Sequence, residues 1–142
     1  MRTSQKGIDF IKEMEGVRLK PYRDVVGILT WGVGHAQQKG ETPPVEMTEE
    51  EADALLADDL LRFELAVSGI GADLTQNEFD ACVSLAFNIG VGNFTKSTLA
   101  KLLVAGNQDA AAEQFVRWNK AGGREVQGLT NRRLKERALF IS

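Results

Sequence analysis

A chain of 142 residues is long enough for one domain with a hydrophobic core. Hydrophobic residues make up 43% and charged residues 26%, with three prolines and no low-complexity tract, which excludes disordered and fibrous architectures. One cysteine and one histidine exclude an internal disulfide and a Cys/His zinc site, so we expect no metal centre.

A first helix is predicted over residues 4–15, with Gly16 ending it. Its apolar residues recur three or four positions apart, and Glu15 follows Ile11 by four positions on the same stripe. The pattern therefore places a carboxylate on an apolar helix face.

Residues 17–35 predict short strands joined by a turn at residues 24–27. Alternation along the second strand gives one packed face and one nearly bare face, which carries Thr30, Gly32 and Gly34. Bare backbone beside a hydroxyl permits close approach of a ligand, but a bend or bulge explains the same glycines. Both interpretations stay open at this point.

Helices are predicted for the rest of the chain. T-x-x-E capping boxes at Thr48 and Thr75 open a long acidic helix to about residue 68 and a second helix ending near residue 90. Three further helices are expected, at about 97–105, at about 109–120 and from about 130 onward. The last is basic, with Arg132, Arg133, Lys135 and Arg137 around Leu134, Ala138 and Ile141.

One small sheet near the N-terminus followed by helices indicates an α+β protein. We expect a single domain in three parts. These are a β lobe at about 16–46, a linking helix at about 48–68, and a helical lobe at about 69–142 that includes the N-terminal helix 4–15.

Glu15 and Asp24 are two carboxylates in unlike predicted surroundings, a helix face and a Gly-containing turn. Burial favours the protonated form of a carboxyl group, whereas an exposed one stays ionised, so such a pair suits general acid and general base catalysis. A helix-terminal Glu and a turn Asp are also common structural features, and spacing alone does not separate the two interpretations.

The motifs are more specific when read together. Residues 15–24 read E-G-V-R-L-K-P-Y-R-D, and residues 27–35 read G-I-L-T-W-G-V-G-H. They resemble the phage-type lysozyme (endolysin) family of glycoside hydrolases, whose pattern is E-G-x-R-L-x-x-Y-x-D, a short turn, and T-x-G-x-G-H. Residues 86–99, 117–123 and 128–136 also look like the family, so the resemblance covers nearly the whole chain.

The resemblance implies a lysozyme-like fold with its active-site cleft between the two lobes, and no cofactor. It implies cleavage of the β-1,4 bond between N-acetylmuramic acid and N-acetylglucosamine in peptidoglycan, with inversion. Carried over by motif position, Glu15 is the general acid, Asp24 is the base or electrostatic stabiliser, and Thr30 helps to place the attacking water.

Four further residues are candidates for binding or orienting. Gly32 and Gly34 belong to the second motif, and either Arg132 or Arg133 is expected to form an ion pair that orients Glu15. The choice between the two arginines stays open, because the match of their segment to the family is looser.

The resemblance and the composition together define the expected partners. Peptidoglycan is the expected substrate of a monomeric enzyme. No 18-residue apolar window and no secretory signal are evident, so we expect no stable membrane insertion, synthesis in the host cytoplasm, and wall access through a holin-like protein.

Three alternatives remain. A lysozyme-like module that only binds glycan would be separated from an enzyme by a lysis assay. A lytic transglycosylase, which typically works with one catalytic Glu, would release anhydro-sugars. Nucleic-acid binding through the basic run at residues 132–137 is disfavoured, because the pI is about 5.2 and no nucleic-acid-reading motif is present.

Overall fold

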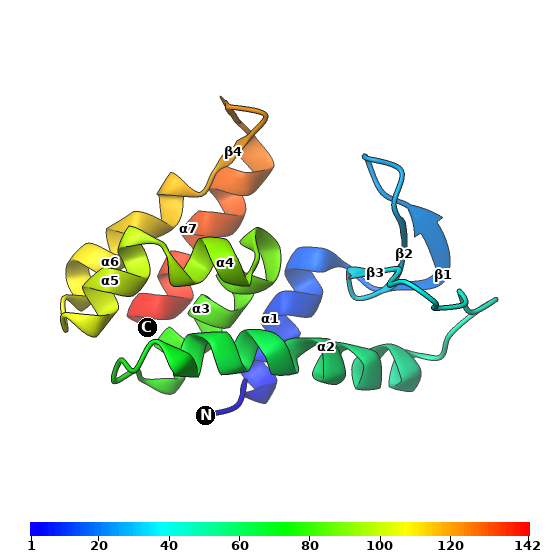
Figure 1. Cartoon of the computed structure of the whole chain (residues 1–142), viewed down its shortest axis with the longest axis horizontal. Coiled ribbons are helices and arrows are strands. Elements are labelled where there is room, and N and C mark those ends of the chain that lie inside the picture. Colours follow the sequence, from blue (N-terminus) through cyan, green and yellow to red (C-terminus); the bar gives the residue numbers. More distant parts are fainter. The chain divides into compact units, whose positions relative to one another are not determined.

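The computed structural model describes residues 1–142 and consists of helices and two small antiparallel sheets (Figure 1). The helices are α1 (Gln5–Glu15), α2 (Glu49–Gly69), α3 (Gln76–Ile89), α4 (Val91–Thr95), α5 (Thr98–Val104), α6 (Gln108–Gln114), the 3-10 helix η1 (Phe115–Arg117) and α7 (Gln127–Ile141). The strands are β1 (Arg18–Arg23), β2 (Leu29–Gly32), β3 (His35–Ala36), β4 (Lys120–Ala121) and β5 (Arg124–Glu125). The predicted α+β class is confirmed.

The chain forms two compact units. Residues 9–61 make one, called the β unit below, and residues 1–8 with 62–142 make the other, the helical unit. None of the helices combines the length and the apolarity that crossing a bilayer requires.

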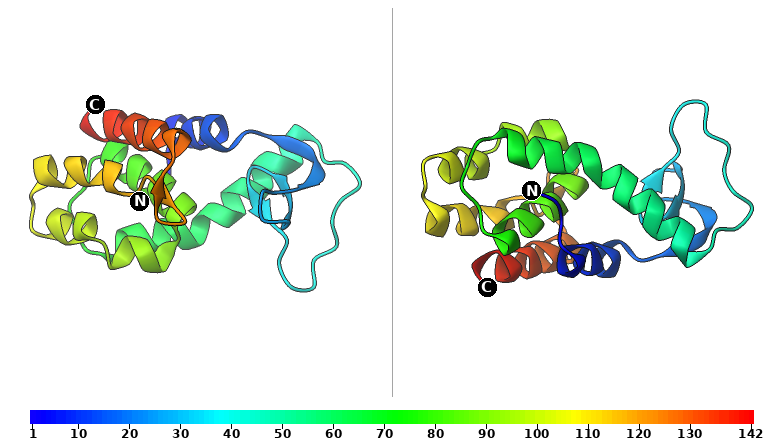
Figure 2. Two further views of the ribbon diagram at one scale, coloured as in Figure 1. Left: turned by 90° about the horizontal axis from the view of Figure 1, so that it is seen from above. Right: turned by 90° about the horizontal axis from the view of Figure 1, so that it is seen from below.

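The β unit is built on the three-stranded sheet, in the order β1-β2-β3. Tyr22 lies opposite Thr30, and Trp31 lies opposite His35. Its core is formed by apolar side chains of α1, of the β2–β3 region and of α2, namely Ile11, Trp31, Val33, Ala52, Leu56 and Leu60. Figure 2 shows the connection between β3 and α2 as a long open loop.

The helical unit is organised around α3, whose residues 79–86 are all buried. Helix α3 packs most extensively against α7, and it also packs against α4 (Figure 2). Helix α5 packs against α6. Phenylalanine and leucine side chains fill the interior, including Phe79, Leu85, Phe94, Leu99 and Phe115.

Local signals in the sequence set several boundaries correctly. Ser4 caps α1 by accepting a hydrogen bond from the Gly7 N–H at 3.1 Å, and Gly16 ends the helix with a φ of 76°. Both capping boxes form. The hydroxyl groups of Thr48 and Thr75 accept hydrogen bonds from the backbone amides three residues later, and the amides of the two threonines donate to the glutamate carboxylates at those positions.

The apolar residues Leu134, Ala138 and Ile141 of the last helix do not form its buried face. Leu134 and Ile141 are 48% and 58% exposed, and Ala138 is also exposed. The buried residues of α7 are Arg132, Arg133, Glu136, Leu139 and Phe140. Periodicity counts only apolar residues, so it misses a face on which arginines and a glutamate neutralise one another. The helix also begins at Gln127 rather than at about residue 130.

The region after α5 also differs from expectation. The helix predicted over 109–120 ends at Gln114, continues as one 3-10 turn, and is followed by a hairpin of β4 and β5. Gly122 and Gly123 have φ values of 59° and 78°, which makes them the turn of this hairpin rather than a simple helix end. The short helix α4 was not predicted, because its sequence is rich in turn residues.

Candidate active site

Glu15 is the last residue of α1 and is half-buried. Gly34 lies directly against its carboxylate, because a Cβ added at Gly34 would stand 2.9 Å from Glu15 Oε1. An ion pair of 2.7 Å between Lys12 Nζ and Asp53 Oδ1 joins α1 to α2 one turn earlier. The Glu15 carboxylate is thus placed between a helix end and a glycine turn.

Asp24 follows β1 and shapes the turn that leads into β2. One carboxylate oxygen, Oδ1, accepts hydrogen bonds from the Val26 amide at 3.0 Å and from the Ile28 amide at 2.8 Å. The backbone of Asp24 also donates to the Ile28 carbonyl at 2.9 Å. These bonds fix the orientation of the carboxylate, while its second oxygen makes no hydrogen bond with the protein.

The prediction that Thr30, Gly32 and Gly34 share one nearly bare strand face is wrong. Thr30 is only 5% exposed, and β2 ends at Gly32. Gly32 and Gly34 have φ values of 65° and 64°, so they bend the chain after the strand instead of lining one of its faces. A Cβ at Gly32 would contact Leu55 and Met47, and of the two glycines only Gly34 adjoins Glu15.

Gly34→Ala is expected to reduce catalysis far more than its backbone strain explains. Both Gly34 and Gly40 have positive φ, so an alanine at either costs about 1–2 kcal/mol in conformational strain. Only at Gly34 does the new methyl group push the Glu15 carboxylate aside. We expect a selective fall in kcat for Gly34→Ala relative to Gly40→Ala. Equal kcat values for the two variants would show that Gly34 does not position Glu15.

His35 is part of a buried cluster that stabilises the β unit. Its Nδ1 lies 2.7 Å from Asp59 Oδ2 and its Nε2 lies 2.8 Å from Glu41 Oε1. Its ring also packs against Trp31, with 5.2 Å between ring centroids. His35 and Trp31 therefore have structural roles in the β unit.

This cluster predicts a pH-dependent stability. Burial lowers the pKa of His35, but the hydrogen bonds to Asp59 and Glu41 outweigh it, so the pKa is raised. Because the folded pKa exceeds the unfolded value of about 6.5, the contribution is complete below that pH and is lost as pH rises through the folded pKa. Urea unfolding at increasing pH should show the stability advantage of the wild type over His35→Gln shrinking. An advantage independent of pH would contradict this prediction.

Arg132 and Arg133 lie in the helical unit on α7. Arg133 is fully buried, with Nε 2.7 Å from Glu136 Oε1, and it donates to Asn88 Oδ1 at 2.8 Å. Arg132 Nε lies 3.3 Å from Glu136 Oε2. Both guanidinium groups are therefore anchored by α7 itself and by α3. The pairing of either arginine with Glu15 stays a prediction.

A polar cavity of about 460 Å³ opens in the helical unit beside β4. Its lining combines two amides, two cations, an indole ring and two aliphatic side chains, from Asn88, Ile89, Asn93, Arg117, Trp118, Lys120 and Leu129. Such groups suit a ligand with hydroxyl, amide and carboxylate groups. Sequence reasoning assigned no role to these residues, although all seven lie in the family-like segments.

Comparisons with known proteins agree over the whole chain. Residues 12–136 match the family model for phage lysozyme. An endolysin of Bacillus phage B103 is 41% identical over 144 residues, which cover 100% of this chain and 55% of that protein, so the chain spans about half the length of this relative.

Solved structures show the same fold. A variant of P22 lysozyme is 42% identical with a TM-score of 0.89, covering 100% of this chain and 99% of the other. The muramidase domain of SpmX from Asticaccaulis excentricus is 34% identical with a TM-score of 0.89, covering 99% and 98%. The lysozyme-like fold is thereby confirmed, and with the match over residues 12–136 the chain belongs to the phage lysozyme family.

Proposed function

We propose that this chain hydrolyses the β-1,4 bond between N-acetylmuramic acid and N-acetylglucosamine in bacterial peptidoglycan, and so lyses the host cell as an endolysin. The observation that carries the proposal is the half-buried Glu15 carboxylate, held at the end of α1 against Gly34. Asp24 and Thr30 stand at their motif positions in the same compact unit.

Each carboxylate has a distinct part in the proposed reaction. Glu15 protonates the glycosidic oxygen, so that the bond to the departing N-acetylglucosamine breaks and the proton leaves with the new hydroxyl. Asp24, whose Oδ1 is held by the turn amides, uses its free oxygen to accept a proton from water or to stabilise the developing positive charge on the sugar.

Thr30 supports this reaction as a water-positioning residue. Its hydroxyl donates to the Ile28 carbonyl at 3.0 Å, which orients the oxygen lone pairs to accept a hydrogen bond from water. A water attacking the sugar face opposite to the leaving group gives inversion at the anomeric carbon, the stereochemistry that we propose.

Asp24→Asn tests the second carboxylate without removing the turn. The amide oxygen still accepts the hydrogen bonds from the Val26 and Ile28 amides, but the negative charge is lost. We expect the rate at which the turbidity of permeabilised bacteria falls to decrease on the order of 10²-fold or more. Asp58→Asn, which changes an exposed aspartate of α2, is the matched control. Near-wild-type lysis by Asp24→Asn would remove Asp24 from the mechanism.

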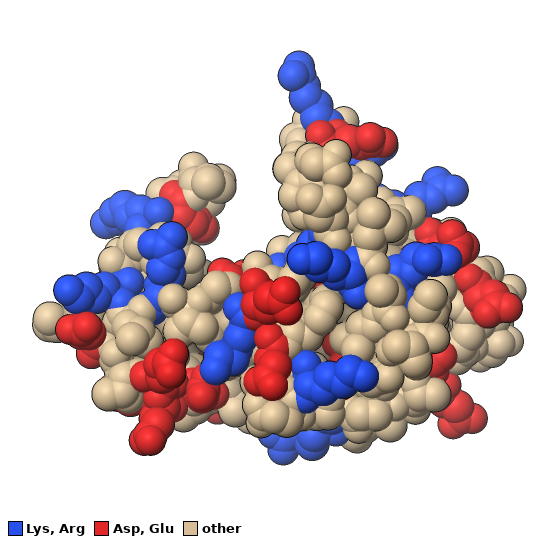
Figure 3. Space-filling view, turned by 180° about the vertical axis from the view of Figure 1, so that it is seen from behind, with Lys and Arg blue, Asp and Glu red and all other residues tan.

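Two other functions are less well supported. A module that only binds glycan has no need for Glu15, Asp24 and Thr30 together at the family spacing. A nucleic-acid surface needs unpaired cations, yet Arg137 Nη2 lies 2.5 Å from Glu113 Oε1, and two other arginines of α7 pair with Glu136. Over the helical unit, Figure 3 shows basic and acidic side chains interspersed rather than one basic patch.

The proposal includes how the enzyme reaches its substrate. We propose synthesis in the host cytoplasm as a monomer, followed by access to the wall after a holin-like protein permeabilises the membrane.

The polar cavity beside β4 offers amide and cationic groups that match the acetamido and carboxylate groups of peptidoglycan.

A further inference from the structure

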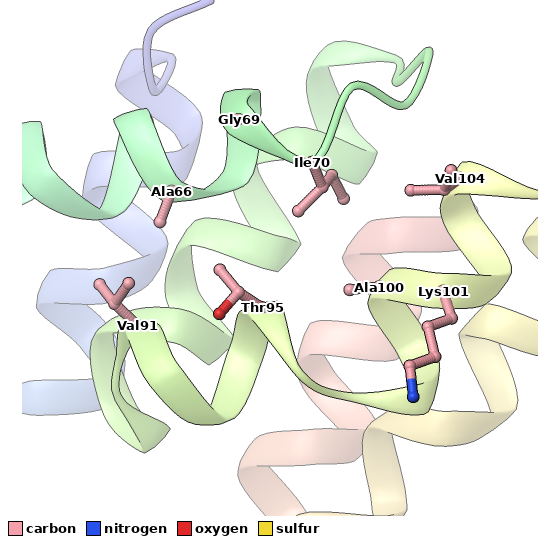
Figure 4. Close-up of a pocket in the computed structure, with 8 residues that line it drawn as sticks. All are labelled: Ala66, Gly69, Ile70, Val91, Thr95, Ala100, Lys101 and Val104. Atoms are coloured by element: carbon pink, nitrogen blue, oxygen red, sulfur yellow. The ribbon is translucent and has the colours of Figure 1, made fainter.

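An apolar cavity of the helical unit is lined by none of the residues assigned to the reaction. It has a volume of about 570 Å³ and is bounded by the end of α2, by α4 and by α5 (Figure 4). Apolar side chains including Ile70 and Val91 face its interior, and Val104 at its rim is 57% exposed. A volume of this size lies within the range of roughly 300–1,000 Å³ that small-molecule sites occupy.

The cavity exists because small residues line its walls. Ala66 and Gly69 of α2 and Ala100 of α5 leave space between the helices, and a Cβ added at Gly69 would have no atom within 4 Å. The cavity is open to solvent, so its apolar lining loses contact with water when a chain-like apolar molecule enters.

Lys101 is the only charged residue that lines the cavity. No acidic side chain lies within ion-pair distance of its ammonium group, unlike Arg132, Arg133 and Arg137 of the same unit. In Figure 4 the Lys101 side chain runs along α5, and its nitrogen lies at the edge of the group of lining residues. The cavity therefore has an apolar body and one positive end.

We propose that this cavity binds a single-chain amphiphile with an anionic head group, of the medium-chain fatty acid class. The alkyl chain lies among Ile70, Val91 and Val104, and the carboxylate lies at the Lys101 ammonium group. An apolar ligand without a charge would leave that cation unused, and a ligand with two or more charges would bury one of them against apolar walls. This inference does not depend on the proposed peptidoglycan hydrolysis.

Titration of the ¹⁵N-labelled protein with octanoate and with the neutral octanol tests the proposal by NMR. We expect saturable shifts of amides confined to residues 66–70 and 91–104 for both ligands. Because the head group meets an exposed cation, octanoate should bind about two- to five-fold more tightly than octanol.

Two variants test where the alkyl chain and the head group of the ligand bind. Gly69→Leu fills the cavity without strain, because Gly69 has no positive φ and an added Cβ would have no close neighbour. This substitution should weaken the binding of both ligands more than tenfold. In Lys101→Gln, octanoate and octanol should bind with equal affinity. The matched controls are Gly128→Leu, at another unobstructed helical glycine, and Lys135→Gln, at an exposed lysine of α7.

Several results would overturn the proposal. These are shifts that do not saturate or that spread over the whole surface, wild-type affinity in Gly69→Leu, and equal affinities for octanoate and octanol in the wild type. A ligand-free dimer that dissociates on Gly69→Leu would assign the cavity to a second copy of the chain instead.

Discussion

Glu15→Gln is expected to abolish peptidoglycan hydrolysis while the protein stays folded. Glutamine keeps the shape of the side chain beside Gly34 but carries no proton to give to the glycosidic oxygen. A general acid contributes on the order of 10²–10⁴ in rate, so the lysis rate should fall by at least about 10²-fold. The measurement is the decrease in turbidity of permeabilised bacteria, with circular dichroism to confirm the fold.

Glu13→Gln is the matched control for this variant, because Glu13 is an exposed glutamate on the same helix two residues earlier. It should lyse cells at the wild-type rate. If Glu15→Gln kept more than about a tenth of wild-type activity, its loss would lie below the low end of a general acid's contribution, and the assignment would be wrong.

The largest loss of stability is expected for Glu136→Gln. The Glu136 carboxylate is fully buried, lies 2.7 Å from Arg133 Nε, and accepts a hydrogen bond from Ser84 Oγ at 2.6 Å. Removing its charge leaves the buried Arg133 without its counter-ion, which costs about 3–5 kcal/mol. Urea unfolding of both proteins at the same pH measures this difference in the free energy of unfolding.

Glu113→Gln provides the comparison at the protein surface. Glu113 forms an ion pair with Arg137, and their side chains are 64% and 34% exposed, so its removal should cost no more than about 1 kcal/mol. Equal losses for Glu136→Gln and Glu113→Gln would contradict the view that the buried Arg133–Glu136 pair holds α7 on α3.

Much of the fold could be predicted from the sequence because the deciding interactions are local. The capping boxes at Thr48 and Thr75 act over three residues, and Gly16 ends α1 through its own φ. The turn after β1 depends on bonds between residues only two to four positions apart, starting at Asp24. These features need no knowledge of the rest of the chain.

The sequence pattern does not predict where charged groups that are distant along the chain meet. Glu64 and Asp80 are buried because they accept hydrogen bonds from the backbone amides of Thr3 and Ser4, more than 60 positions away. Asp59 is buried for a similar reason, beside the imidazole of His35. A pattern of apolar residues does not predict such partners, and for the same reason it does not predict that Arg132, Arg133 and Glu136 are buried on α7.

The candidate site was predictable in its residues but not in its local geometry. The motif identified Glu15, Asp24 and Thr30, whereas alternation placed Gly32 and Gly34 together on one strand face. The positive φ of both glycines separates them, so that only Gly34 adjoins the Glu15 carboxylate. The alternation of side chains along a strand does not predict that the chain bends after only four strand residues.

Mass spectrometry of purified peptidoglycan digested by the protein tests the proposed function most directly. Hydrolysis of the proposed bond leaves N-acetylmuramic acid at the new reducing ends, and this product should form with the wild type and be absent with Glu15→Gln. Anhydro-muramic acid ends would identify a lytic transglycosylase, and reducing N-acetylglucosamine ends or released stem peptides would show that a different bond is cut. Any of these three products in place of reducing N-acetylmuramic acid would contradict the assignment of this chain as a muramidase.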